Sequence, residues 1–187
     1  MTIYDKGLLR AMKEAYKGSG YYVALTEDGL LIQTAFWGVE IVEEAVPNSI
    51  KSLIVLHNGG LPRMNTAVCV QKAECGSAIL ETVCSTMDGL SRGYTTTGGV
   101  PIKPTRLTID GMRVWQTTTD LAIRVVYVED QQIIAGEKMD AVLVGGFIYA
   151  RVWYGSVYIR PQLTEPEDLP LMEHLAQMQW ISLDSED

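Results

Sequence analysis

Four basic side chains near the start of the chain are spaced so that they could bind a polyanion. In an α-helix, where each residue advances by about 100°, they fall within an arc of about 60° if residues 5–17 are helical. The four are Lys6, Arg10, Lys13 and Lys17. A stripe of a single charge sign attracts phosphates, so we expect a track for duplex DNA. An ordinary solvated helix face over a core would look the same, and this alternative stays open.

Residues that could carry catalysis or hold a metal are few and scattered. The histidines, His57 and His174, lack a His-x-x-x-His spacing, and Cys69, Cys75 and Cys84 form no close pairs. A zinc site and a disulfide framework are therefore not indicated. The sequence also lacks a glycine-rich phosphate loop and a Gly-x-Ser-x-Gly elbow. We expect no enzyme activity, no cofactor and no metal; a site assembled from dispersed groups remains the alternative.

The composition and the net charge restrict the kind of partner that the whole surface can bind. The chain has 187 residues, 47% of them hydrophobic and 20% charged, with a formal net charge of -8. This balance argues against general nucleic-acid binding and leaves room for one local basic patch. Since no signal peptide and no membrane span are visible, we expect a cytoplasmic protein with no membrane partner.

The elements that must position the basic stripe are predicted from hydrophobic period and turn residues. Residues 1–90 are predicted to fold as helix, hairpin, helix, hairpin, with an Asp-Gly turn at Asp28 and Gly29. The helices are predicted at Asp5 to Lys17, opposite apolar residues such as Leu8 and Met12, and from Pro47 to about His57. The strands are predicted at 21–25, 30–34, 39–46, 66–72 and 77–84.

The rest of the chain is predicted to be richer in strands. Residues 91–104 are a linker or a long loop inside one sheet, because glycine, threonine and proline dominate there. The part 105–187 has a second Asp-Gly turn at Asp110 and Gly111 and ends in a helix at 165–179, or one that begins only at Pro170. Its strands are predicted at 105–109, 112–117, 121–128, 140–154 and 157–160. The fold class is therefore α+β, rich in antiparallel sheet.

A weak internal repeat leads to a resemblance. The stretch DGLLIQTAFWGVEIVEEAV from Asp28 is similar to DGMRVWQTTTDLAIRVVYV from Asp110, each with an Asp-Gly turn and a strand ending in Gln-Thr. The second stretch, with its Thr-Asp-Leu before another strand, resembles a hairpin of the DNA sliding-clamp family, the polymerase processivity factors. The order of elements in the first half resembles that family more fully. The second half departs from it, since no helix precedes its Asp-Gly hairpin and none follows until residue 165.

What the resemblance implies is two clamp-like subdomains with helices on one face, in a homo-oligomer around DNA. The basic stripe would touch the duplex without reading its sequence, and a polymerase or a related factor would be the second partner. The alternative is a structural or assembly protein of a phage or other mobile element. In that case the protein would self-associate through edge strands around Val142 to Tyr154.

Overall fold

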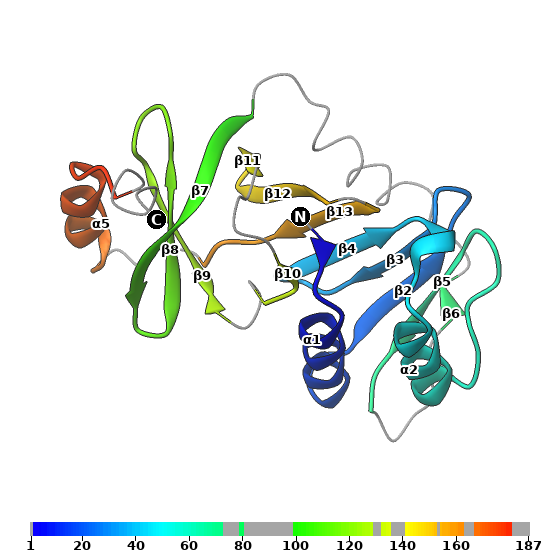
Figure 1. The fold of residues 1–187 in the computed structure, drawn as a ribbon. Helices are drawn as coiled ribbons and strands as arrows, with labels where there is room; N and C mark the ends of the chain where they lie inside the picture. The colour runs from blue at the N-terminus through cyan, green and yellow to red at the C-terminus, as the bar shows by residue number, and fades with distance from the viewer. Residues whose placement is uncertain are drawn as a thin grey trace.

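The computed structural model is an α+β protein built on one large antiparallel sheet (Figure 1). It describes residues 2–72, 79–80, 99–128, 132–135, 141–152, 154–162 and 167–180. Across these residues the helices are α1 (Asp5–Lys17), α2 (Asn48–Asn58), α5 (Leu169–Ala176) and the short 3₁₀ helix η1 (Glu43–Ala45). The α+β, antiparallel class predicted from the sequence is confirmed, whereas the two clamp-like subdomains stay a prediction.

The sheet has eleven strands and takes both halves of the chain into one layer. Its order is β6-β5-β2-β3-β4-β13-β12-β11-β7-β8-β9. The N-terminal strands are β2 (Tyr21–Leu25), β3 (Leu30–Gln33), β4 (Trp37–Ile41), β5 (Thr66–Val70) and β6 (Ile79–Leu80). The others are β7 (Val100–Ile109), β8 (Met112–Thr117), β9 (Ile123–Tyr127), β11 (Ala141–Val144), β12 (Phe147–Val152) and β13 (Gly155–Ile159). A separate two-stranded ladder pairs β1 (Thr2–Ile3) with β10 (Ile134–Ala135).

The two halves meet where β4 pairs with β13, in a register that places Gly38 opposite Tyr158. A Cβ atom on Gly38 would lie 2.2 Å from the Tyr158 ring, so this glycine makes room for an aromatic side chain in a regular ladder. The Tyr158 hydroxyl donates to the Thr34 carbonyl at 3.2 Å, and the Ser156 hydroxyl donates to a Glu40 carboxylate oxygen at 3.1 Å. Side-chain and backbone bonds therefore hold this junction together.

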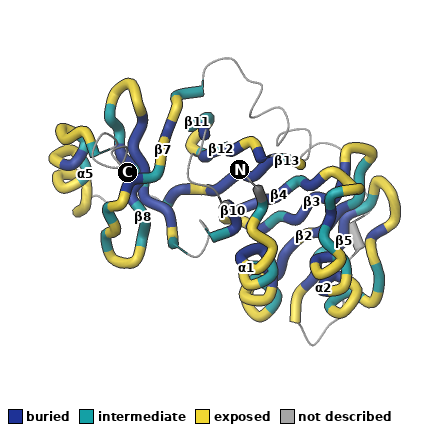
Figure 2. The backbone as a smooth tube through the Cα atoms, in the orientation of Figure 1, coloured by how far each residue is buried: buried dark blue, intermediate teal, exposed yellow. Residues whose placement is uncertain are grey.

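The helices lie at the two ends of the sheet (Figures 1 and 2). Buried side chains of α1 and α2 join the main core, which also contains Trp115 of β8. A smaller core forms where Leu175 of α5 meets Val114 of β8. Because neighbouring residues of a strand point to opposite faces, Val114 and Trp115 place α5 on the face away from α1 and α2. The prediction of helices on one face is right for α1 and α2 and wrong for α5.

The two Asp-Gly sequences form different turns. Ile109 pairs with Met112, so Asp110 and Gly111 are the two turn residues, with φ of 48° and 78°. That turn is the predicted one. In the first hairpin Thr26 and Gly29 exchange backbone hydrogen bonds, which moves the turn one residue earlier and leaves Gly29 beside the backbone of β4.

Three predicted elements have different limits. The strand expected at 39–46 ends at Ile41, because the next residues form η1 and Pro47 then lacks an N–H for a ladder. The last helix is shorter than 165–179, with Pro170 in its first turn. The region 142–154 is not at an edge: β11 lies between β7 and β12, and β12 pairs with β13.

The expected linker at 91–104 overlaps β7 from Val100 onward, and its residues 91–98 lie outside the described part. Most of the strand expected at 77–84 also lies outside it, with β6 as the described part. Cys75 and Cys84 also lie outside the described residues.

Candidate nucleic-acid interface

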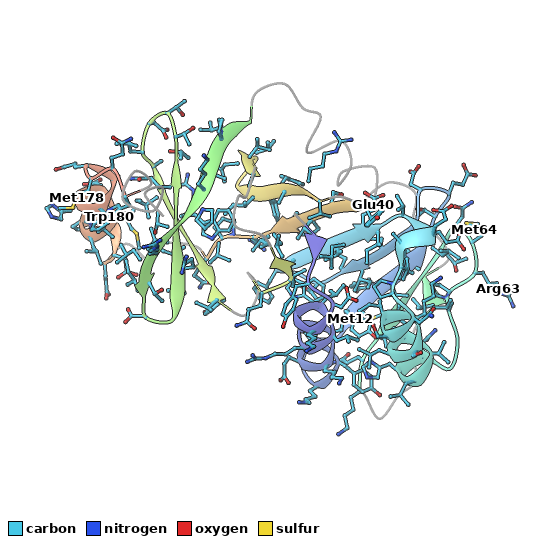
Figure 3. The ribbon with its side chains drawn as sticks, in the orientation of Figure 1. Met12, Glu40, Arg63, Met64, Met178 and Trp180 are labelled. Atoms are coloured by element: carbon cyan, nitrogen blue, oxygen red, sulfur yellow. The ribbon has the colours of Figure 1, made fainter. Side chains whose placement is uncertain are left out.

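Helix α1, which carries the basic stripe, is fixed to the rest of the protein at both ends and along its buried side. Leu8 and Met12 have no exposed surface (Figure 3 shows Met12 pointing to the sheet). At its start, a Cβ on Gly7 would lie 1.9 Å from the Gln132 carbonyl oxygen, so the helix approaches that backbone closely. At its end, the Lys72 N–H donates to the Tyr16 carbonyl at 2.9 Å, and the Gln71 side-chain amide donates to the Gly18 carbonyl at 2.8 Å. The stripe is thus displayed by a firmly seated helix.

All four predicted site residues are exposed, on the side of α1 away from the core. Lys17 forms an ion pair with Glu14 at 2.8 Å, and Arg10 donates to the Gln132 side chain at 3.4 Å. Within the part of the chain that the structure describes, Lys6 and Lys13 have no ion pair. The structure therefore brings the four residues together on one surface, two of them without an ion pair among the described residues.

The joint between α1 and α2 is an aromatic stack that the sequence analysis did not predict. The ring of His57 stacks on Tyr16, with centroids 3.8 Å apart and planes 7° from parallel. Its Nδ1 lies 3.0 Å from the hydroxyl of the buried Tyr21. Burial lowers the pKa of His57, and the charge of Lys13 lowers it further. The stack keeps a neutral ring between the two helices beside the basic stripe.

Charge is distributed unevenly along the chain. Residues 1–72 contain seven Lys or Arg and seven Asp or Glu, whereas residues 73–187 contain eight and sixteen. The whole net charge of -8 thus belongs to the second stretch. In the helix layer, α1 carries two acids, Asp5 and Glu14, and α2 carries none. These two helices therefore carry more basic than acidic side chains, which favours the approach of an anion.

The described residues offer little support for a metal site or an active site. No group of three or more His, Cys, Asp and Glu side chains in that part is placed to hold a metal. A small pocket of about 260 Å³ lies beside the start of α1, where Asp5 is joined by mostly apolar neighbours. These neighbours are Ile3, Ile41, Ala45, Pro47 and Tyr154. One carboxylate among apolar walls offers no acid–base pair, and absence of enzyme activity stays a prediction.

Comparison with known protein families, curated proteins and solved structures gave no match. Of the helices in the described residues, none is long and apolar enough to cross a membrane.

Proposed function

We propose that this protein contacts duplex DNA through the basic stripe of α1, without reading base sequence. One observation carries the proposal: four exposed basic side chains lie along one side of a helix whose opposite side packs on the core through the buried Leu8 and Met12. Arg and Lys on an exposed helix reach phosphate oxygens, which are the same at every base pair. The contact therefore supplies affinity and orientation rather than specificity.

The dimensions of the stripe fit a short stretch of backbone. From Lys6 to Lys17 the helix rises about 16 Å, which is the length of about five base-pair steps. Four phosphate contacts predict that the logarithm of the binding constant falls with the logarithm of salt concentration with a slope of about -3.6. Affinity should then drop about a hundredfold between 50 and 200 mM salt.

The test is a charge-reversal variant in which Lys6, Arg10, Lys13 and Lys17 are all replaced by Glu. We expect loss of binding to a fluorescent duplex in anisotropy titrations, with an unchanged far-UV circular dichroism spectrum. A smaller variant, Lys6→Glu with Lys13→Glu, breaks no described ion pair and should weaken binding by about tenfold or more. Its control is Lys103→Glu with Arg160→Glu, which changes the net charge equally at other exposed positions.

Unchanged binding by the folded fourfold variant would end the proposal. Equal weakening by the two double variants would show that overall charge, and not the stripe, governs the contact.

We further propose that the contact serves to tether a polymerase or a related factor, as the resemblance to sliding clamps implies. The support is the order helix, hairpin, helix in the first half, which gives one two-helix layer per chain. Retention on nicked circular DNA, compared with the same DNA made linear, separates encirclement from simple contact. A clamp-like protein is lost from the linear form through its ends, whereas simple contact treats both forms alike.

A further inference from the structure

Two parts of the sequence carry charge of a single sign. Residues 45–72 contain three basic residues, Lys51, Arg63 and Lys72, and no Asp or Glu. Residues 161–187 contain seven Asp or Glu and no Lys or Arg. The first part includes α2 and the second includes α5. Opposite charges segregated in this way attract each other when the two parts can approach.

The basic part presents an apolar ridge on α2. One face of this helix is buried in the main core, and the other face exposes Val55 and Leu56, which are 44% and 77% exposed. These two residues line a shallow depression together with Asn48, Lys51 and Ser52. We call these five residues the α2 ridge. The loop after α2 adds Arg63 and Met64, both exposed (Figure 3). The acids nearest in sequence, Glu43 and Glu44, belong to η1, before the start of the helix.

The acidic part presents an apolar surface of similar kind on α5. Leu175 faces the small core, while Leu169, Leu171 and Met178 are between 42% and 49% exposed. Three exposed acids stand among them: Glu167, Asp168 and Glu173. Exposed apolar groups that are surrounded by charges of one sign are typical of protein interaction sites. We call this set the α5 surface.

The two surfaces of one chain lie far apart. Figure 1 places α5 and α2 at opposite ends of the molecule, and Figure 3 shows Met178 at one end and Arg63 and Met64 at the other. Within one chain they do not meet. Their complementary charges therefore point to two different copies.

We propose that the α5 surface of one copy docks on the α2 ridge of a second copy. Leu171 and Met178, which are seven residues apart and so lie on one side of α5, would cover Val55 and Leu56, and the acids would lie against Lys51 and Arg63. Such a contact is heterologous, because the two copies contribute different surfaces. The pair still has one free α2 ridge and one free α5 surface, so further copies can add to form rings or open chains. This inference goes beyond the DNA contact and does not use the stripe on α1.

The test uses one variant at each surface. Leu56→Asp places a charge on the α2 ridge, and Leu171→Asp places one on the α5 surface; both positions are exposed, so the fold should persist. In analytical ultracentrifugation at low salt we expect the wild type to form dimers and larger species as its concentration rises. Each variant alone should be monomeric. An equal mixture should form a dimer and nothing larger, because each partner supplies the one surface that the other lacks.

The role of charge is tested by reversal. Lys51→Glu with Arg63→Glu should weaken association by about tenfold or more. Glu167→Lys with Asp168→Lys should also weaken self-association. When the two charge-reversed proteins are mixed, opposite charges face each other again, and the affinity should be restored.

A wild type that stays monomeric at about 100 µM in low salt would overturn the proposal. So would a mixture of the two Asp variants that stays monomeric while the wild type associates, since self-association would then use other surfaces. Leu171→Asp lies on α5, at the end of the molecule away from the basic stripe, and should keep DNA affinity, so failure here is distinct from failure of the proposed function.

Discussion

The two ends of the sheet hold their helices by different means. At one end, α1 and α2 contribute fully buried side chains, among them Leu8, Met12 and Ile50, to the main core. At the other end, α5 gives one buried side chain, Leu175, to a small core, and hydrogen bonds of Gln116 hold the segment that follows. The first attachment is mainly apolar area, and the second combines a small apolar cluster with a few directional bonds.

This difference separates what each surface can do. A surface displayed by α1 moves only if the main core opens, so the basic stripe is a rigid feature. The α5 end depends on few contacts and should open locally at a free-energy cost well below that of global unfolding. The following predictions test this contrast, starting with the largest expected effect.

Matched truncations in the two cores should differ in size and in extent. Met12→Ala leaves a cavity in the main core and should lower the free energy of unfolding by about 3 kcal/mol. Leu175→Ala, in a small cluster that can close around the gap, should cost about 1–2 kcal/mol. Urea denaturation followed by far-UV circular dichroism gives both values, and hydrogen exchange shows which segments lose protection.

We expect protection to fall across α1, α2 and the central strands in the first variant, and mainly in α5 in the second. If the two variants shifted the urea midpoint equally, and hydrogen exchange rose throughout the protein in each of them, the sheet and all its helices would unfold as a single cooperative unit. The two ends would then not differ in stability.

Removing the polar anchor of the C-terminal segment should have an intermediate effect. The buried Gln116 side chain donates to the Met178 carbonyl at 2.6 Å and accepts from the Trp180 N–H at 2.9 Å. Gln116→Leu keeps the volume and leaves both backbone groups without these partners, which should cost about 1–3 kcal/mol. Limited proteolysis should then cut near residues 169–180 faster than in the wild type.

Gln177→Leu, at an exposed position of the same segment, serves as the control for replacing an amide by an apolar side chain. Should Gln116→Leu be cleaved no faster than the wild type, apolar packing alone would hold this segment.

The smallest expected effect is a pH dependence that belongs to the helix layer. The folded state lowers the pKa of His57 through burial and Lys13, so the unfolded chain takes up a proton first as the pH falls below 6.5. The contribution of His57 to the stability of the fold is therefore fully present above pH 6.5. It is lost as the pH drops through the lower pKa of the folded state. Because His57 is only partly buried, we expect a loss in Tm of about 1–2 °C between pH 7.5 and 5.5.

Thermal scans of His57→Gln should lack this part of the pH dependence, and those of His174→Gln on the exposed side of α5 should retain it. A wild-type slope that persists in His57→Gln would assign the effect to other groups.

Local features were predictable from the sequence, and they include the placement of the candidate site. The period of apolar residues gives α1 and α2, and glycines at positions 18 and 59 mark where they end. Gly59 adopts φ of 80°, as a helix terminus of this kind requires. Since the stripe depends on helical spacing alone, its four residues could be placed without knowledge of any neighbour.

Long-range features were not predictable in the same way. The pairing of β4 with β13, the side on which α5 packs and the stacking of Tyr16 on His57 join residues far apart in sequence. A strand pattern shows that a strand has a buried face and does not name its partner. For the same reason 142–154 was predicted to contain edge strands, although β11 and β12 have partners on both sides.

The junction between β4 and β13 has a consequence for biosynthesis. Ser156 of β13 follows its partner Glu40 by 116 residues. At a translation rate of 5–20 residues per second, β4 leaves the ribosome about 6–23 s before β13 can pair with it. During that interval a nascent chain exposes an apolar strand with a free row of backbone donors and acceptors, which is the part of this protein that a ribosome-associated chaperone would need to cover.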